Sequence, residues 1–435
     1  MYINEIYKRV IKNFKLLGSG KILGGISSAL TIFIVAREIG VKNFGVLSIA
    51  ISFVEICNIL LSLRVWEATI KFLGDHKNDT TIRSDILCWS LKLSLKTSII
   101  ACVTICSFSY FFIDYIFNFE INLLNLILIY SFLCILVTTN ETIDSFFRSS
   151  DSYKYILINN SLSNLIRFVI VLIILQFTDR MELIILGMGS SIFVGFLIRI
   201  KFLIELFTKL SYSFKFKNIK SFGPKRDFLK FAISTHLASI INLANEKNLG
   251  VLLIGYIAGP FYSGLFKAAR SIAKLLRRIM DPILEIAYPE FVILVKEKKL
   301  ADLQKLILNS TKILGIASLM IGSIILLFSK NIISIFFGVD YLDASSALVL
   351  LIIAGLINNL SYWITPAILS FNKPRVLLIM SFFISILYIL ILYPLITEFQ
   401  HVGAASAGIV RSMLVLTIGT LIYKNISKKE SSTLV

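Results

Sequence analysis

Apolar runs of about twenty residues recur along the whole chain, and they constrain its fold more than any other feature. A helix needs roughly 20 mostly apolar residues to cross ~30 Å of hydrocarbon. Runs of this length follow one another with short polar connections, near residues 16–36, 43–65, 86–113, 121–146, 155–177, 181–203, 227–257, 261–287, 304–329, 344–370, 375–397 and 402–424. The sequence therefore predicts an all-α polytopic membrane protein with about 12 transmembrane helices.

The composition favours a membrane protein over a soluble one. Charged residues make up 16% of the 435 residues and hydrophobic residues 57%, whereas roughly a quarter of a soluble domain is charged. One soluble globule cannot bury that much apolar surface, so a bilayer must cover part of it. No small-residue cleavage site follows the basic first residues, so we expect the first apolar run to be retained as a span.

Lys and Arg concentrate in alternate connections between the spans. If the amino terminus is cytoplasmic, the cytoplasmic segments contain 25 of these residues and the outer segments only four, Arg37, Lys42, Arg180 and Lys330. Cytoplasmic loops of membrane proteins carry an excess of Lys and Arg. We therefore predict that both termini are cytoplasmic. Much of the net charge of +18 then sets topology and meets anionic lipid, without any nucleic acid as partner.

A weak internal repeat appears when the chain is shifted by 219 residues. The matching positions are small or aromatic residues near the first and second spans of each half, in the pairs Gly40–Gly259, Gly45–Gly264, Ala50–Ala269, Ala68–Ala287 and Phe72–Phe291. The offset is half the chain and covers six spans, so both halves keep the same orientation. We predict two parallel six-helix bundles, 1–208 and 227–435, joined by a basic cytoplasmic linker, 209–226, around a central cleft.

The eighth span carries a row of basic residues that a buried helix would not tolerate. Five cations recur at spacings of three and four residues along it, at Lys267, Arg270, Lys274, Arg277 and Arg278. At 100° per residue they fall within about 100° of one face. Each charge at membrane depth costs at least ~2.5–3.5 kcal/mol, so such a stripe must line water or meet an anion. For Arg277 and Arg278, a role as interfacial anchors is equally open.

Other spans contribute isolated charges. Lys21 lies on the first span, Glu55 on the second, Arg167 on the fifth, Glu246 and Lys247 on the seventh, and Arg411 on the twelfth. Cations in a wet cleft of low dielectric attract phosphate, and Arg can bind its oxygens through two hydrogen bonds. We expect an anion-binding cleft, with Glu55 and Glu246 as candidates for H⁺ or Na⁺ coupling. A counter-ion role for Glu55 remains open.

The residues that enzymes use are not arranged here as a catalytic or metal site. The sequence shows no Ser-His-Asp order, phosphate-binding loop or metal-ligand spacing, and its five cysteines lie in apolar runs. We therefore expect no cofactor apart from a coupling ion, and no enzymatic activity. A membrane glycan polymerase or acyltransferase is the alternative from the enzyme class, but a large outer loop is typical of such polymerases and the outer connections here are short.

Three segments resemble bacterial polysaccharide flippases, the Wzx-type members of the multidrug, oligosaccharidyl-lipid and polysaccharide exporter superfamily. They are the opening NFKLLGSGKILGGISSALTIFIVAREIGVKNFGVLSIAISF, the stretch FFRSSDSYKY after the fourth span, and YSGLFKAARSIAKLL with the later DPILEIAYPEF around the eighth. The resemblance implies a MATE-like fold and export of an undecaprenyl-pyrophosphate-linked oligosaccharide repeat unit, such as an O-antigen unit, from the cytoplasmic to the outer leaflet by alternating access.

The resemblance also implies a place and partners for the protein. It would lie in the bacterial inner membrane and bind membrane lipid and a lipid-linked oligosaccharide, with other glycan-assembly proteins as further candidate partners. In this family the first, second, seventh and eighth helices line the cleft. That would place there Lys21, Glu55, Glu246, Lys247, Lys267, Arg270, Lys274 and Arg277. Asn358, Asn359 and Trp363 are candidates for sugar contacts or for packing. The main rival is a cation-coupled multidrug exporter of the same fold, against which the basic stripe argues.

Overall fold

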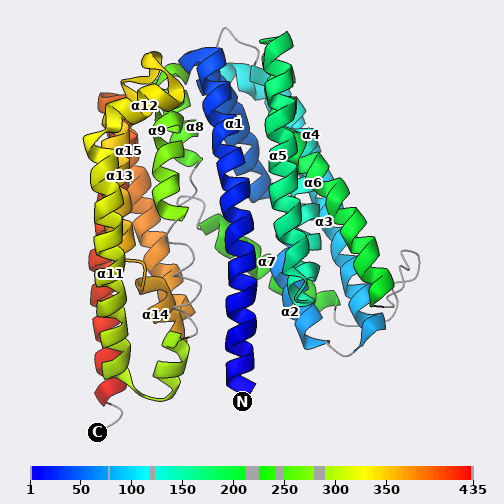
Figure 1. Cartoon of the computed structure of the whole chain (residues 1–435), viewed down its shortest axis with the longest axis vertical. Helices are drawn as coiled ribbons and strands as arrows, with labels where there is room; N and C mark the ends of the chain where they lie inside the picture. The colour runs from blue at the N-terminus through cyan, green and yellow to red at the C-terminus, as the bar shows by residue number, and fades with distance from the viewer. Residues whose placement is uncertain are drawn as a thin grey trace. The chain divides into compact units, whose positions relative to one another are not determined.

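A computed structural model describes residues 2–76, 79–117, 123–210, 225–241, 248–278 and 290–432, without side chains at 2–23, 238, 241, 276–278 and 430–432. These residues contain helices and no strand (Figure 1). The longer helices are α1 (Tyr2–Leu61), α3 (Thr80–Ile116), α4 (Leu123–Ser149), α5 (Tyr153–Phe177), α6 (Met181–Lys209), α7 (Lys225–Ile241), α9 (Pro260–Arg278), α11 (Leu300–Leu327), α13 (Ala344–Leu360) and α15 (Pro374–Ser432). The shorter ones are α2 (Trp66–Asp75), α8 (Leu249–Ile257), α12 (Ser329–Phe337), η2 (Val339–Tyr341) and α14 (Ile364–Ser370).

The predicted all-helical membrane fold is confirmed. Eight segments within the described residues are long and apolar enough to cross a membrane. Two of them, Gly24–Leu61 and Pro374–Lys429, each overlap two predicted spans, so the eight account for ten of the twelve. The seventh predicted span coincides with α7 and α8, and the eighth with α9.

Both long merged helices turn sharply at one residue. In α1 the break is Gly40, at φ 75° and ψ 172°, and in α15 it is Gln400, at φ 49° and ψ −123°. Glycine reaches positive φ without a steric penalty, which explains its presence at the first break. Each merged helix is therefore two successive spans joined by a tight turn.

The helices divide into two compact units. The first comprises Met1–Ile39 and Ile49–Leu243, and the second comprises Gly40–Ser48 and Ala244–Val435. The short segment 40–48 thus packs within the second unit, although the chain on both sides of it belongs to the first. The boundary between the compact units falls after Leu243, whereas the predicted linker, 209–226, marks where the sequence repeat divides the chain.

The first unit is held together by an aromatic and aliphatic core near the ends of its helices. Phe146 and Phe147 of α4 are fully buried there, together with Phe228 of α7 and Leu73 of α2. Phe72 and Phe228 lie 5.2 Å apart between ring centroids. The amphipathic helix α2, in the polar connection after the second span, therefore packs α7 onto this unit.

A buried arginine ties two helix ends of the first unit together. Arg83 of α3 is 4% exposed and donates from Nη1 to the carbonyl oxygen of Leu73, at 3.3 Å. From Nη2 it reaches the hydroxyl groups of Ser149, at 3.5 Å, and Ser150, at 3.2 Å. Carbonyl groups in the last turn of a helix have no intrahelical donor, so a guanidinium satisfies one of them here. In the sequence analysis Arg83 is one of the 25 basic residues assigned to cytoplasmic segments, and no packing role is predicted for it.

The second unit packs α9, α11 and α15 around α13. Its core contains Phe291, fully buried, with Trp363 and Tyr423 5.0 Å apart between ring centroids. Phe291 is the repeat partner of Phe72, and each of the two lies in the core of its own unit. The weak sequence match therefore marks positions with the same packing role.

The turns after the fourth and tenth spans are alike, as the repeat would require. Asp151 at φ 51° and Asn372 at φ 56° each follow a helix end. The amide of the next residue, Ser152 or Lys373, donates to a carbonyl five residues back, at 2.8 Å and 3.4 Å respectively. Asp and Asn tolerate this left-handed conformation better than most residues. The two turns differ by 221 positions, so the offset of 219 grows by two residues within the second half.

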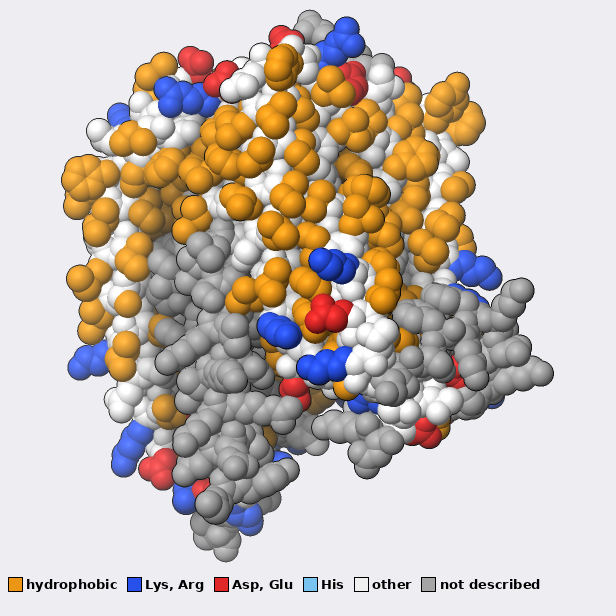
Figure 2. All heavy atoms as spheres, turned by 45° about the vertical axis from the view of Figure 1, so that its right-hand side comes forward, with side chains coloured by type: hydrophobic (Ala, Val, Ile, Leu, Met, Phe, Trp, Pro, Cys, Tyr) orange, Lys and Arg blue, Asp and Glu red, His pale blue; other side chains and the backbone are white. Residues whose placement is uncertain are grey.

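The surface of the helices is largely apolar, as a lipid-covered protein requires. Figure 2 shows hydrophobic side chains spread over much of one face, with charged side chains at its top and in its lower half. Exposed apolar residues include Phe111 of α3, Ile173 of α5 and Met320 of α11. A soluble protein rarely exposes such continuous apolar surface.

Candidate functional site

The basic face of α9 points away from the core of the second unit. Ala268, Ala269 and Ile272 are buried on one side of the helix. On the other side Lys267 and Arg270 are partly exposed and Lys274 is exposed. Pro260 begins the helix, where its missing amide proton costs no hydrogen bond. The predicted stripe is therefore a helix face whose described positions are partly or fully exposed.

Arg270 and Arg411 meet around one tyrosine of α15. The guanidinium of Arg411 lies 5.9 Å from the ring centroid of Tyr388, and both arginines act electrostatically on the Tyr388 phenol. Arg270 also lies 5.9 Å from the ring centroid of Phe266. The eighth and twelfth spans thus each place a guanidinium group near Tyr388, and the predicted role of the two arginines in a cleft stays a prediction. Tyr388 was not predicted, because nothing in its own segment distinguishes it from a lipid-facing aromatic residue.

Several predicted site residues lie outside the described side chains. They are Lys21 and Arg277, whose backbone is helical, and Glu246 and Lys247, which fall between the described ranges 225–241 and 248–278. Their predicted roles in phosphate binding or ion coupling stay predictions.

Glu55 lies in the first unit beside a tyrosine of α4. The hydroxyl of Tyr130 donates to Oε1 of Glu55 at 3.2 Å, and Tyr130 is 8% exposed. Arg167 of α5 acts electrostatically on the same phenol. A carboxylate and a guanidinium from two different helices therefore flank one buried hydroxyl in the middle of the spans.

Arg167 is the most unusual charge of the first unit. Its Nη1 reaches the Ser191 hydroxyl only at 3.5 Å, and its Nε and Nη2 are buried without a hydrogen-bond partner. Unpaired buried donors are rare in proteins and call for a water, an ion or a second conformational state. The sequence showed a charge at this depth but could not show that two of its donors lack a hydrogen-bond partner.

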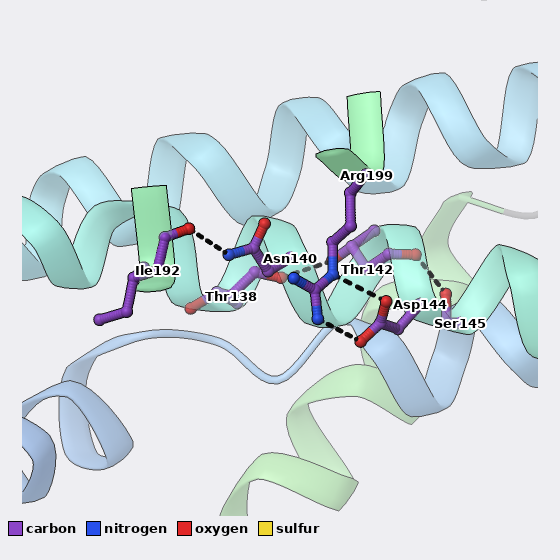
Figure 3. Close-up of polar contacts among 7 residues, drawn as sticks. All are labelled: Thr138, Asn140, Thr142, Asp144, Ser145, Ile192 and Arg199. Atoms are coloured by element: carbon purple, nitrogen blue, oxygen red, sulfur yellow. Dashed lines mark hydrogen bonds and ion pairs between the residues drawn. The ribbon is translucent and has the colours of Figure 1, made fainter. Parts of the chain in front are cut away.

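Arg199 of α6, in the same unit, has a carboxylate as the hydrogen-bond partner of its guanidinium group. It donates from Nε to Oδ1 of Asp144 at 2.8 Å and from Nη2 to Oδ2 at 2.9 Å, as Figure 3 shows. Asn140, one turn earlier on α4, donates to the carbonyl oxygen of Ile192 at 3.2 Å. This network binds α4 to α6 and is structural, because both ends of the ion pair are buried.

A second charged cluster lies where α1 ends and α2 begins. Nη2 of Arg64 pairs with Oε1 of Glu67 at 2.7 Å. The guanidinium groups of Arg64 and Arg148 lie 5.4 Å and 5.5 Å from the ring of Trp66. Burial raises the pKa of Glu67 above its usual 4.5, and the nearby Arg64 opposes that rise only in part.

Asn359 and Trp363 are packing residues in this structure. Nδ2 of Asn359 donates to the hydroxyl of Ser318 at 3.0 Å and the residue is buried. Trp363 is 8% exposed in the core. Of the two roles that the sequence left open, packing is the one the geometry supports. Within the described ranges, His, Cys, Asp and Glu form no group that could hold a metal ion.

Comparisons with known proteins agree with this architecture. The family described as polysaccharide biosynthesis protein matches residues 10–295. A candidate O-antigen transporter of Escherichia coli (strain K12) is 27% identical over 181 residues, which is 40% of this chain and 42% of that relative. The match therefore spans less than half the length of that curated relative.

Solved structures show the same fold at low sequence identity. An inward-facing multidrug resistance MATE family transporter of the MOP superfamily aligns with a TM-score of 0.73 and 16% identity, over 92% of this chain and 96% of that one. A MOP superfamily transporter from Pyrococcus furiosus, described as having a binding pocket of reverse polarity that suggests a different function, aligns with a TM-score of 0.59 and 15% identity, over 95% and 96%. The MATE-like fold is thereby confirmed.

Proposed function

Because the chain belongs to the polysaccharide biosynthesis protein family and has the fold of MATE transporters, we propose that this membrane exporter is a flippase. Its cargo would be an oligosaccharide unit linked to undecaprenyl pyrophosphate, carried from the cytoplasmic to the outer leaflet of the bacterial inner membrane. The protein would work by alternating access, with both termini in the cytoplasm, and it would transport without catalysing a reaction.

The basic face of α9 is the observation that carries this proposal. Lys267, Arg270 and Lys274 are at least partly exposed along one helix face, and Arg411 joins Arg270 near Tyr388. A pyrophosphate carries several negative charges and accepts hydrogen bonds from Arg in pairs. In a site of low dielectric such cations attract phosphate far more strongly than they do in water. The polyprenyl chain would meanwhile stay in lipid, which the apolar outer surface permits.

Ion coupling is a separate part of the proposal. Glu55, held by the Tyr130 hydroxyl at 3.2 Å, would exchange a proton or Na⁺ during the cycle. A carboxylate at membrane depth is costly and marks a functional site by default. The unpaired donors of Arg167 would provide a second partner for this carboxylate when its ion has left. Coupling would then bias which side of the protein is open.

The multidrug exporter is the competing function within this fold. A cationic drug would bind best beside carboxylates in a site with few cations, which the basic face of α9 is not. In the P. furiosus transporter, likewise, a binding pocket of reverse polarity suggests a different function. Polarity of the site thus supports the flippase over the drug exporter.

Flipping itself tests the proposal. The protein would be reconstituted in liposomes with a fluorescent polyprenyl-pyrophosphate oligosaccharide, and exposure of the label to an external quencher would be followed. We compare the wild type with Arg270→Ala and Lys274→Ala, using Lys305→Ala as the matched control. Lys305 is an exposed lysine of α11 outside the basic face.

We expect flipping by the wild type and Lys305→Ala and its loss in Arg270→Ala and Lys274→Ala, with all variants monodisperse in detergent. Undiminished flipping by both α9 variants would remove the basic face as the pyrophosphate site. No flipping by the wild type, together with export of a cationic dye, would establish the drug exporter instead.

A further inference from the structure

Two glycines from the two sequence repeats lie back to back in the second unit. A methyl group added at Gly45 would overlap the carbonyl group of Pro260 and lie 3.1 Å from the Gly264 nitrogen. One added at Gly264 would overlap the carbonyl oxygen of Val41 and lie 3.2 Å from the Gly45 nitrogen. The backbones of the two helices therefore touch at this point, which only glycine allows.

The contact is reciprocal in a way that the repeat explains. Shifting Val41 by 219 residues gives Pro260, and shifting Gly45 gives Gly264. Gly45 contacts Pro260, and Gly264 contacts Val41, which is the repeat equivalent of Pro260. Such self-complementary contacts arise where a two-fold axis relates the two surfaces. The preceding turns match as well, with φ 75° at Gly40 and φ 93° at Gly259.

One side chain breaks this symmetry and anchors the segment. Phe44 is 1% exposed and lies 6.5 Å from Phe337 and 6.3 Å from Tyr341 between ring centroids. Its repeat equivalent is Ser263, whose hydroxyl donates to the Val251 carbonyl oxygen within the unit, at 2.8 Å. Phe44 therefore helps to fasten segment 40–48 to the second unit.

We propose that this contact is the outer gate of the transport cycle, an inference that rests on the proposed alternating-access function. The predicted topology places the turns at Gly40 and Gly259 on the outer side of the membrane. Segment 40–48 packs in the second unit while the chain before and after it belongs to the first. A movement of the first unit therefore pulls on this segment through covalent bonds at both of its ends.

The chemistry of the contact suits repeated opening. Two glycine backbones share only van der Waals contact and no interlocked side chains, so they separate without rotamer changes. Withdrawal of Phe44 from its aromatic partners supplies the resistance that keeps the gate closed at rest. Gly40, already at positive φ, is the residue best able to absorb the backbone change. Gate opening thus consists of undocking residues 41–45 from residues 260–264.

Distance measurements between two spin labels test this gate. The labels are placed at Lys42 and Val339, both exposed and neither part of the glycine contact, in a chain whose five native cysteines are replaced. Double electron–electron resonance is recorded for this chain and for Gly45→Ala, Gly264→Ala and Phe44→Ala. Gly408→Ala is the matched control, because a methyl group there lies 3.9 Å from Ala354 in ordinary contact.

We expect one short distance in the parent and in Gly408→Ala. In the two gate glycine variants, the population with the longer distance should rise roughly tenfold relative to the population with the shorter distance, because one overpacked methyl group destabilises a packed state by about this much. Phe44→Ala should give the same shift by removing the anchor without adding volume, and it decides the matter if the glycine variants do not fold. Unchanged distances in folded Gly45→Ala and Phe44→Ala would overturn the gate.

The measurement needs no substrate, so the gate and the proposed function can fail separately. A shift of the distance together with no flipping by the wild type would retain the gate and remove the flippase. Flipping with an unshifted distance would retain the flippase and make the glycine contact a packing feature only.

Discussion

Arg199 holds Asp144 through two parallel hydrogen bonds, Nε to Oδ1 at 2.8 Å and Nη2 to Oδ2 at 2.9 Å. Both residues are 8% exposed, so neither charge has water as an alternative partner. A buried ion pair of this geometry adds little net stability, but removing one member leaves the other charge uncompensated.

Arg199→Ala should therefore lower the free energy of unfolding by about 3–5 kcal/mol, the cost of stranding a buried Asp144 carboxylate. The change would be measured by thermal unfolding in detergent. Lys201→Ala on the exposed face of the same helix is the control and should change it by less than about 0.5 kcal/mol. Equal stability of both variants would show that Asp144 finds another partner or a proton.

Arg167→Met, in contrast, should lower transport without lowering stability. The buried Nε and Nη2 donors of Arg167 have no partner in this structure, so an apolar chain of similar length should leave stability unchanged or raise it. If those donors hydrogen-bond to the Glu55 carboxylate during the transport cycle, the substitution should lower the flipping rate at least tenfold. Melting temperature and flipping rate are measured on the same preparation, with Arg180→Met in the exposed turn before α6 as control. A less stable but fully active variant would contradict both expectations.

Glu55→Gln should uncouple flipping from the ion gradient. The amide can still accept from Tyr130, whose hydroxyl donates to Oε1 at 3.2 Å, but it can bind neither a proton nor Na⁺ in the physiological range. We expect the rate in liposomes to stop responding to an imposed pH or Na⁺ gradient, while Glu38→Gln, at an exposed position, keeps the response. A gradient response that survives in Glu55→Gln would leave Glu55 as a counter-ion.

The pH dependence of stability should report Glu67. Burial raises the pKa of this carboxyl above its usual 4.5, so the folded state holds the proton more tightly than the unfolded state. Its contribution to stability is then fully present below the unfolded pKa and is lost as the pH rises through the folded pKa. The melting temperature of the wild type relative to Glu67→Gln should fall across that window. A difference that grows with pH instead would mean that the 2.7 Å pair with Arg64 outweighs burial.

The spans were predictable because hydrocarbon thickness acts on each segment separately. An apolar run of about twenty residues becomes a membrane helix whatever its neighbours are, and ten of the twelve predicted spans overlap segments that meet this criterion. The helical period also predicted the basic face of α9, because Lys267, Arg270 and Lys274 are neighbours on one helix. These features depend only on local sequence.

The remaining features depend on helices that are distant in sequence. Arg270 and Arg411 both lie near Tyr388, and two donors of Arg167 lack partners, because of how whole helices pack. The repeat predicted which glycines correspond, but only the structure shows that Gly45 and Gly264 touch. A period or spacing cannot reveal such pairs.

The mismatch between Phe44 and Ser263 also bears on how the chain assembles after insertion. Two parallel repeats that both present a bare glycine backbone could dock onto the matching segment of a neighbouring copy, since membranes confine proteins at high local concentration. Of the two glycine segments, 40–48 carries the ring that packs against Phe337 and Tyr341, and both of those rings come from the second half of the chain. Pairing of like with like would leave Phe44 without its aromatic partners, so the more stable product is one chain folded on itself.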